Sequence, residues 1–385
     1  MSNSFMPNES MIYHCVDGNP GGGIKTYVDA VASLQTLGVH PTILTSLNDA
    51  DFSQIKLLHF HHGILLRDFN NECPAVITMH NHAPYCPSGT KYLASRGKLC
   101  TRNMSSLGCI WGHLVDGCGS RNPANIKHNI GRAHQFLDNL IRLKIPVLTV
   151  SDFLRHQLIA HGVSHQQVVT LPITTSAKTI NAQPLTPEIH RNLRLLYAGR
   201  INPTKSLGWL LRALSKTNDC IHLDIAGEGW YKDQMQSLAQ QLGISDRIIW
   251  HGWCNQEKLG ELYQNCFALC FPSQMEPAGI VILEAYANYR PVIGSRSGGA
   301  AEYIHHQNTG FLIPPGNAHE LARTIEELAN DYKRAHSMGI QGNQLLYDKF
   351  SFEKHSQTLG KIYSAAIEGY HRGNPPDLTK IETSL

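Results

Sequence analysis

The sequence predicts an α/β protein built from two doubly wound domains, and three observations support this prediction. At 385 residues, the chain exceeds the size at which one hydrophobic core usually stops growing. Short apolar runs alternate with amphipathic stretches along almost the whole chain, which is typical of parallel sheets covered by helices on both faces. A polar, proline-containing stretch, residues 174–192, separates two series of such runs.

Each series of apolar runs predicts the strands of one parallel sheet. The first series is MIYHCV, PTILTS, KLLHFH, AVITMH, PVLTVS and VVTLPI, and the second is RLLYAG, HLDIAG, RIIWHG, FALCFPS, PVIGS and GFLIPP. We therefore assign 1–178 to an N-terminal domain, 179–189 to a linker and 190–345 to a C-terminal domain. Residues 346–385 form a C-terminal helical segment that we expect to cross back to the N-terminal domain, with its last residues frayed.

Composition excludes several classes of protein. Charged residues make up 16% of the chain and the net charge is +3, so no basic surface for nucleic acid is indicated. The sequence contains no run of 18 apolar residues, which argues against a membrane span, although peripheral membrane contact stays open. The first ten residues lack the features of a secretion signal, so we expect a cytoplasmic protein.

Residues 83–126 depart from the alternating pattern and show no clear period. The segment holds Cys86, Cys100, Cys109 and Cys118, whose spacings differ from those of common zinc sites. Four thiols in one aperiodic segment could still supply a structural zinc site, with His113 as a further candidate. The alternative is that each thiol is separately buried or partly exposed.

A junction in the second half carries two cations. The run RLLYA ends at Ala198, and Arg200 and Lys205 lie in the loop before an apolar helix. Such a junction directs backbone N–H groups and the positive end of the helix dipole toward the carboxyl edge of a sheet, where a phosphate would bind. The alternative is two ordinary solvated cations, and this loop alone does not decide between them.

Two acids flank a turn further along the chain. Pro277 favours an extended conformation at Glu276, and the small residues Ala278 and Gly279 allow a ligand close to the backbone. Glu284 lies about 7–8 Å further along the predicted helix, at ~1.5 Å per residue. Two carboxylates at this separation suit a ligand with hydroxyl groups at two places and phosphates between them. The alternative is an acid near a helix start and a solvent-facing glutamate. It explains Glu276 acceptably, but it explains poorly why Glu284 lies inside an apolar run.

The first half offers weaker signals. The stretch NPGGGIKTYV places Gly22 and Gly23 between a strand and a helix, where they could wrap a phosphate or form a simple tight turn. His80 ends the run AVITM and would point toward the carboxyl edge of the first sheet, although a structural histidine is the more common outcome. The neighbouring HFHHG, residues 59–63, is interpreted as structural or as part of an acceptor side.

Taken together, these stretches resemble the retaining, nucleotide-sugar-dependent glycosyltransferases of family four, which have the GT-B fold. The resemblance rests on GGGIKTYV, TMH, VSDFLRHQLIAHG, YAGRINPTKSL, IAGEG and HGW, and above all on EPAGIVILEAYANYRPVIGSRSGGAAEYI followed by GFLIPPGN. The resemblance covers nearly the whole chain. It implies two Rossmann-like domains that face each other across a cleft.

The resemblance also implies roles for individual residues. Arg200 and Lys205 would neutralise the donor diphosphate, Glu284 would hold the ribose, and Glu276 would accept a hydroxyl of the donor sugar. The remaining donor contacts would come from Gly22, Gly23, His80, Ala278, Gly279 and Ile280. Catalysis would need no metal. This sequence has Asn81 where an aspartate is frequent, which leaves the orienting partner of His80 undetermined.

The resulting hypothesis is transfer of a hexosyl-type group from a nucleoside-diphosphate sugar, with uridine diphosphate favoured, to a hydroxyl of a glycan, lipid or small-molecule acceptor. Such a reaction belongs to glycan, polysaccharide or glycolipid synthesis. Two alternatives stay open: a nucleotide-sugar epimerase on the same fold, and a catalytically silent protein that binds sugar nucleotides.

Overall fold

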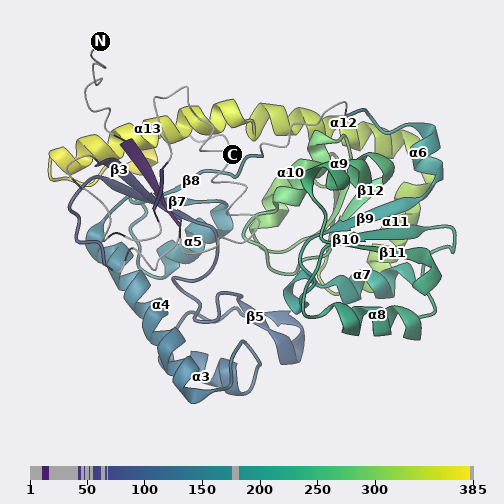
Figure 1. Cartoon of the computed structure of the whole chain (residues 1–385), viewed down its shortest axis with the longest axis horizontal. Coiled ribbons are helices and arrows are strands. Elements are labelled where there is room, and N and C mark those ends of the chain that lie inside the picture. Colours follow the sequence, from purple (N-terminus) through teal and green to yellow (C-terminus); the bar gives the residue numbers. More distant parts are fainter. Residues whose placement is uncertain are drawn as a thin grey trace, which may run out of the picture. The chain divides into compact units, whose positions relative to one another are not determined.

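The computed structural model describes residues 11–16, 42–44, 47, 52, 55–61, 66, 68–175 and 182–381. The chain divides into two compact units, each with its own parallel sheet (Figure 1). Unit 1 comprises residues 1–89, 102–176 and 352–385, and unit 2 comprises residues 90–101 and 177–351. None of the described helices is long and apolar enough to cross a bilayer.

Unit 1 contains a six-stranded sheet in the order β2-β1-β3-β4-β7-β8, with every pair parallel. Its strands are β1 (Met11–Cys15), β2 (Thr42–Leu44), β3 (Ile55–Phe60), β4 (Ala75–Met79), β7 (Val147–Thr149) and β8 (Val168–Thr170). Its described helices are α3 (Ser106–Leu114), α4 (Pro123–Leu143), α5 (Asp152–Ala160), α13 (Phe352–His371) and the 3-10 turn η7 (Leu378–Lys380).

Unit 2 contains a second six-stranded parallel sheet in the order β11-β10-β9-β12-β13-β14. Its strands are β9 (Arg194–Ala198), β10 (His222–Ala226), β11 (Ile248–Gly252), β12 (Ala268–Phe271), β13 (Val292–Ser295) and β14 (Gly310–Ile313). Its α-helices are α6 (Pro187–Arg191), α7 (Leu207–Leu214), α8 (Lys232–Gln241), α9 (Gln256–Asn265), α10 (Ile280–Ala287), α11 (Ala318–Asn330) and α12 (Tyr332–Lys349), with 3-10 turns η4 (Pro203–Lys205), η5 (Ser245–Arg247) and η6 (Gly299–Tyr303).

The predicted α/β architecture is confirmed, since all twelve apolar runs of the sequence hold a strand. In unit 2 the chain moves from β9 outward to β11 and then returns to the other side of β9 for β12. The direction of the chain across the sheet therefore reverses between β9 and β12. Ligands of doubly wound sheets bind beyond the carboxyl ends of the strands at such a reversal.

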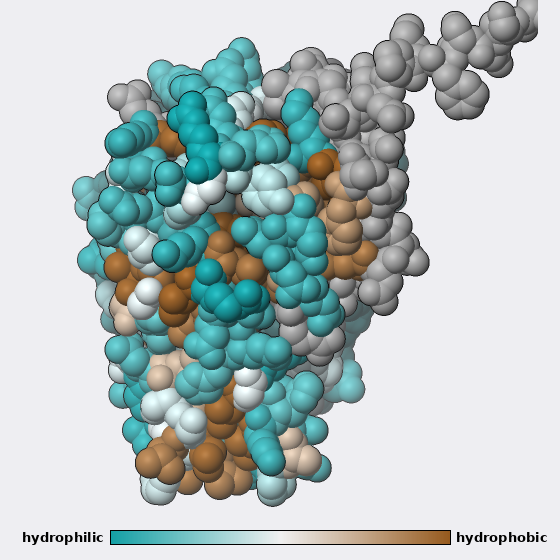
Figure 2. Space-filling view, turned by 90° about the vertical axis from the view of Figure 1, so that its left-hand side faces the viewer, coloured by the Kyte–Doolittle hydropathy of each residue, from teal (hydrophilic) through white to brown (hydrophobic). Residues whose placement is uncertain are grey.

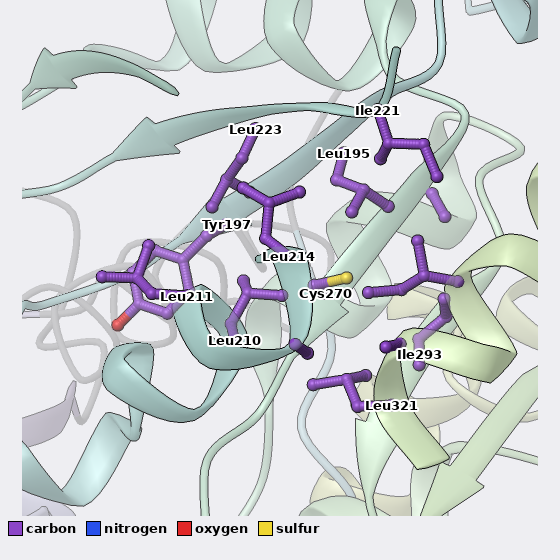
Figure 3. Packing of buried hydrophobic residues seen from close by; sticks show 14 of the residues in the cluster. Leu195, Tyr197, Leu210, Leu211, Leu214, Ile221, Leu223, Cys270, Ile293 and Leu321 are labelled. Atoms are coloured by element: carbon purple, nitrogen blue, oxygen red, sulfur yellow. The ribbon is translucent and has the colours of Figure 1, made fainter. Parts of the chain in front are cut away.

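The core of unit 2 keeps the two strands at this reversal rigid. Figure 3 shows Leu210, Leu211 and Leu214 of α7 against the sheet, together with Leu321 of α11 and sheet residues such as Leu195. Burying one leucine side chain contributes roughly 1.5–3 kcal/mol. The ends of β9 and β12, and hence the loops that follow them, are held by this packing.

The structure differs from the sequence prediction in three places. Segment 83–126 is folded: it contains α3, the start of α4 and the two-stranded ribbon of β5 (Tyr92–Leu93) and β6 (Lys98–Leu99), joined by η3 (Ala94–Arg96). The ribbon, residues 90–101, belongs to unit 2, whereas the segment was assigned to the N-terminal domain. The predicted linker, 179–189, includes the first residues of α6, and its residues 179–181 lie outside the described part of the chain.

The third difference is the C-terminal tail, which was expected to fray. Leu378 of η7 is fully buried, and its N–H donates to the carbonyl of Gln166 at 2.8 Å. Hydrophobic burial therefore fixes the tail as far as Ile381. The helical segment before it is α13, which belongs to unit 1, and α12 extends past the predicted domain end at 345.

Candidate active site

The loop after β9 carries Lys205 in a fixed conformation. Lys205 ends η4, and Asn202 caps this turn because its Oδ1 accepts from the Lys205 N–H at 3.2 Å and from the Thr204 hydroxyl at 2.8 Å. Ser206 follows in the left-handed region with φ 54°, and α7 begins at Leu207. The backbone at Lys205 is thus held by its own loop.

Lys205 forms an ion pair with Glu276, which lies in the loop after β12. Both side chains are mostly shielded, with 16% of Lys205 and 21% of Glu276 exposed. A second bond joins the same two loops, since the N–H of Gln274 donates to the carbonyl of Thr204 at 3.3 Å. The two loops at the chain reversal therefore place a cation and an acid in contact.

The loop after β13 holds the backbone around Glu276 by hydrogen bonds. The N–H of Ala300 donates to the Glu276 carbonyl at 3.2 Å, and the Ser297 hydroxyl donates to the carbonyl of Gln274. Gly298 has φ +67°, and a Cβ there would lie 2.7 Å from the Glu276 carbonyl oxygen. Only glycine combines this conformation with this close approach.

Arg200 lies in the same loop as Lys205, and its side chain is exposed. The hydroxyl of Tyr197 donates to the Arg200 carbonyl at 2.9 Å. Burial raises the pKa of Tyr197, the charge of Glu276 raises it further, and the Arg200 cation opposes both. Glu276 and Arg200 thus act on one buried phenol, which places both charges beside the end of β9.

Glu284 lies on α10, the helix that follows the Glu276 loop. The helix begins at Ile280 after the buried N-cap Gly279, so Glu284 is its fifth residue, as predicted. The hydroxyl of Tyr263 on α9 donates to Glu284 Oε2 at 3.0 Å. Burial raises the pKa of the half-buried Glu284 carboxyl, and this hydrogen bond only partly offsets it. Removal from water disfavours the charged form, so a ligand that donates hydroxyl hydrogens would stabilise it.

Of the other predicted donor contacts in unit 2, Ala278 and Ile280 are half-buried on either side of Gly279. Gly22 and Gly23 lie outside the described residues. A pocket of about 200 Å³ adjoins the Lys205 loop and is lined by Asn202, Trp209 and the ribbon residue Tyr92. Neither Lys205 nor Glu276 lines this pocket.

His80 of unit 1 follows β4 and is bonded to another histidine. His61 Nδ1 lies 3.1 Å from His80 Nε2, and His61 Nε2 lies 2.8 Å from His14 Nδ1. The amide oxygen of Asn81 accepts from the N–H of Ala83 at 2.9 Å, as in an Asx turn. His61 is therefore one hydrogen-bond partner of His80, whose orienting partner the sequence left undetermined.

Three buried histidines form the one metal-compatible group in the described part of the chain. Donor atoms of His14, His59 and His61 all lie within 4.8 Å of one another. Burial lowers the pKa of each imidazole, so all three are neutral at pH 7, the form that binds metals. In His59 both ring nitrogens are bonded at 2.7 Å, to Tyr363 and to Thr78. The cluster is thus a hydrogen-bonded network that extends to His80.

The four cysteines of segment 83–126 do not form such a group with one another. Cys86 is buried, while Cys100, Cys109 and Cys118 are half-buried. Cys100 belongs to the ribbon of unit 2, whereas the other three belong to unit 1. His113 Nδ1 is bonded to the Ser120 carbonyl at 3.0 Å. Zinc held by these thiols stays a prediction for elemental analysis of the purified protein.

Sequence reasoning missed three residues that shape the site: Asn202, Tyr263 and Gly298. The dipeptide Asn202–Pro203 is a helix-start signal that could have identified the cap, because proline is favoured at the first position of such a turn. No local pattern links Tyr263 to Glu284, or Gly298 to Glu276. Tyr263 and Glu284 lie on the helices before and after β12, and Glu276 and Gly298 lie in the loops after the paired strands β12 and β13.

Residues 185–345 match the family model described as glycosyl transferases group 1, and this stretch holds both cations and both acids of the site. This stretch, which is less than half of the chain, is similar to that family. The predicted resemblance to family-four glycosyltransferases is thereby confirmed.

Relatives described as glycosyltransferases are similar to parts of this chain. The chain is 30% identical to an uncharacterized glycosyltransferase of Methanocaldococcus jannaschii over 176 residues, 45% of each chain. It is 30% identical to a D-inositol 3-phosphate glycosyltransferase of Streptomyces bingchenggensis over 46% of this chain and 41% of the relative. These alignments span less than half of either relative. A longer one, at 26% identity, covers 72% of this chain and 69% of an alpha-1,3/1,6-mannosyltransferase of Dictyostelium discoideum.

Solved structures share the whole fold. Anabaena HepE in complex with UDP matches 92% of this chain and 100% of its own, with TM-score 0.68 and 16% identity. Sucrose-phosphate synthase from Thermosynechococcus elongatus matches 92% and 98%, with TM-score 0.70 and 20% identity. At these identities the likeness shows the fold, and the predicted GT-B fold is confirmed.

Proposed function

We propose that the protein transfers a hexosyl group from a nucleoside-diphosphate sugar to an acceptor hydroxyl, with retention at the anomeric carbon. The observation that carries the proposal is the Lys205–Glu276 ion pair, which joins the loops after β9 and β12 where the chain direction reverses. The match of residues 185–345 to the group 1 family model supports it. The UDP and UDP-glucose complexes of Anabaena HepE support a uridine diphosphate donor.

The ion pair suggests how the donor enters the site. Without a ligand, Glu276 neutralises Lys205 in a shielded position. A diphosphate that binds between Lys205 and Arg200 replaces the carboxylate as the partner of the cation. Glu276 is then available to accept a hydrogen bond from a hydroxyl of the donor sugar, so the diphosphate and the sugar are recognised together. A charge-assisted bond of this kind is roughly twice as strong as a neutral one.

Glu284 supplies the second carboxylate, for the ribose. Its charge is disfavoured by burial, and within the described part of the chain the Tyr263 hydroxyl donates one hydrogen bond to it. Two ribose hydroxyl groups would donate further bonds to the two carboxylate oxygens and would restore the solvation that burial removes. Donor binding would therefore offset the desolvation cost of the buried Glu284 carboxylate.

In the proposed reaction the bond between the anomeric carbon and the phosphate oxygen breaks, and a bond from that carbon to the acceptor oxygen forms on the same face. The proton of the acceptor hydroxyl moves to the leaving phosphate oxygen. Lys205 and Arg200 stabilise the negative charge that develops on the diphosphate, the role of a divalent metal in other transferases. We therefore propose that no metal is required, and activity should persist after treatment with a chelator.

The first test compares Lys205→Ala with Lys258→Ala. Lys258 also pairs with a glutamate in unit 2, Glu261, but both partners are about half exposed. We expect Lys205→Ala to lower turnover by about 10²–10³-fold, as loss of a transition-state charge contact does. Lys258→Ala should leave turnover unchanged. Equal turnover in both variants, measured with a panel of sugar nucleotides, would contradict the proposal.

The second test is Glu284→Gln, which keeps an acceptor for the Tyr263 hydroxyl but removes the charge. Donor-dependent thermal stabilisation should be lost. Stability without donor should be equal or higher at neutral pH, because the folded-state pKa of Glu284 is raised and its ionised form opposes folding above the ordinary glutamate pKa. Loss of donor binding together with lower stability would indicate a structural role instead.

Product analysis separates the alternatives. A transferase forms a glycoside only when acceptor is present, and the anomeric configuration of that product, read by NMR, tests retention. Conversion of the donor sugar without acceptor would indicate an epimerase, and donor binding without any turnover would indicate a silent binding protein. The acceptor class and a cytoplasmic location are proposals at the same level, tested by acceptor screening and cell fractionation.

A further inference from the structure

Helix α3 presents an apolar face to solvent. Leu107, Ile110, Trp111 and Leu114 are spaced as one helical stripe, and 84%, 38%, 56% and 48% of their side chains are exposed. Val115, at the C-cap, is 45% exposed. These are five of the eleven large hydrophobic residues that are exposed in the described part of the chain. Such a contiguous stripe marks a binding surface rather than scattered surface residues.

The opposite face of α3 anchors the helix, so the stripe keeps a fixed orientation. Gly112 and His113 are buried, and a Cβ on Gly112 would lie 2.9 Å from Cys118 Sγ. The Ser105 hydroxyl caps the first turn, and His161 Nε2 accepts from the N–H of Met104 at 3.1 Å. The apolar residues are therefore displayed by a folded element. Figure 2 shows brown side chains gathered at the lower end of the molecule, the height at which Figure 1 draws α3.

The charged residues that lie near this helix in the sequence are mostly cations. Asp116 is the only acid between residues 102 and 137, and its side chain is 2% exposed and paired with Arg102. Arg121, Lys127 and Arg132 are exposed in the same stretch. The whole chain is nearly balanced, with 33 Lys and Arg against 30 Asp and Glu, so the local excess of cations is a property of this region.

We propose that α3, with the cations at the start of α4, docks the protein on the surface of an anionic lipid bilayer. Leucine, isoleucine and tryptophan side chains would enter the interface between headgroups and acyl chains, and Arg121 and Lys127 would contact lipid phosphates. A second copy of the chain would cover the apolar stripe but would bring its own cations against these. The charge pattern therefore favours an anionic lipid surface as the partner.

The test is flotation of the full chain with vesicles of phosphatidylcholine, with or without phosphatidylglycerol. We expect binding to the anionic vesicles that weakens with added salt, because screening reduces the electrostatic part. The double variant Leu107→Ser/Trp111→Ser should weaken binding by about tenfold or more. Tyr347→Ser on α12, which removes a 61% exposed aromatic ring, should bind as the unmodified chain does.

A matched pair of variants tests how much the cations contribute to lipid binding. Arg121→Glu/Lys127→Glu should remove the preference for phosphatidylglycerol, whereas Lys361→Glu, an exposed cation on α13 of the same unit, should leave most of it. Absence of binding to either vesicle, or binding that the α3 variant does not change, would overturn the proposal. So would a concentration-dependent dimer in light scattering that the α3 variant abolishes. The assay needs no donor or acceptor, so its outcome is independent of the proposed transferase activity.

Discussion

The hydrogen bond between His61 and His80 identifies a residue that sequence patterns had treated only as structural or acceptor-side. A neutral imidazole carries a proton on one nitrogen and a lone pair on the other, so each bond in the chain His14–His61–His80 restricts the tautomer of the next ring. His61 therefore restricts both the orientation of the His80 ring and which of its nitrogens carries the proton. If His80 contacts the donor, as the resemblance implies, His61 is a positioning residue.

We expect His61→Ala to lower kcat by up to about 100-fold, because a catalytic contact displaced by about 1 Å loses that much. His61→Asn should recover most of the activity, since its side-chain amide can replace Nδ1, the atom that bonds His80. His61→Gln, whose amide replaces Nε2, should keep the bond to His14 but not the one to His80. The measurement is kcat together with the ¹⁵N shifts of His80, which report its tautomer. Unchanged His80 shifts in His61→Ala would contradict the positioning role.

The positions of the candidate site residues are easier to identify in the sequence than the residues that support them. Arg200, Lys205, Glu276 and Glu284 follow strands or begin helices, and such positions are visible in one dimension. Their partners Tyr263 and Gly298 lie 21 and 22 residues away from the acids they contact, and only the folded sheet with its helices brings them close. The His61–His80 bond likewise depends on β3 and β4 being neighbours in the sheet.

At the scale of elements, strands were predictable because apolar runs of four to six residues between polar helices have few other structures available. Helix α3 was not predicted, since its apolar stripe faces solvent and the period of its sequence does not indicate a core. The burial of η7 also escaped prediction. A short proline-containing tail has no periodicity, and Leu378 is its single strong anchor.

This anchor leads to a prediction about the tail. Leu378→Ala should lower the free energy of unfolding by about 2–5 kcal/mol, the usual cost of truncating a fully buried leucine. Lys380→Ala, which alters an 81% exposed side chain in the same turn, should have little effect. Urea unfolding followed by circular dichroism measures both variants. Equal stability of the two would show that the tail does not contribute to unit 1.

On the scale of the whole molecule, the two units differ in how they should respond to acid. Unit 1 buries His14, His59, His61 and His355 completely or nearly so, and burial lowers the pKa of each. For His14 and His355 the pKa falls from 6.5 to about 4. In unit 2, by contrast, the described histidines with a lowered pKa are His305, half-buried, and His306, exposed.

The direction of the pH effect follows from these shifts. Between pH 6.5 and about 4, these histidines are protonated in the unfolded chain but stay neutral in folded unit 1. The stability of unit 1 therefore rises with pH and is lost as the solution is acidified. Each pKa unit corresponds to about 1.4 kcal/mol, so one such histidine changes stability by roughly 3 kcal/mol across the window. Unit 1 should therefore open before unit 2 on acidification. Hydrogen exchange followed by mass spectrometry at pH 7 and pH 5 measures each unit separately.

A single variant tests whether buried histidines cause the effect. The Nδ1–H of His355 donates to the Pro172 carbonyl at 2.8 Å, and the amide of asparagine can donate from nearly the same place without titrating. His355→Asn should therefore flatten the acid dependence of exchange in unit 1, whereas His305→Asn in unit 2 should not. If both units lost protection together, or if unit 2 opened first, the acid response would have to come from charges other than these imidazoles. The comparison needs no ligand, because the lowered histidine pKa values arise from burial in the folded chain itself.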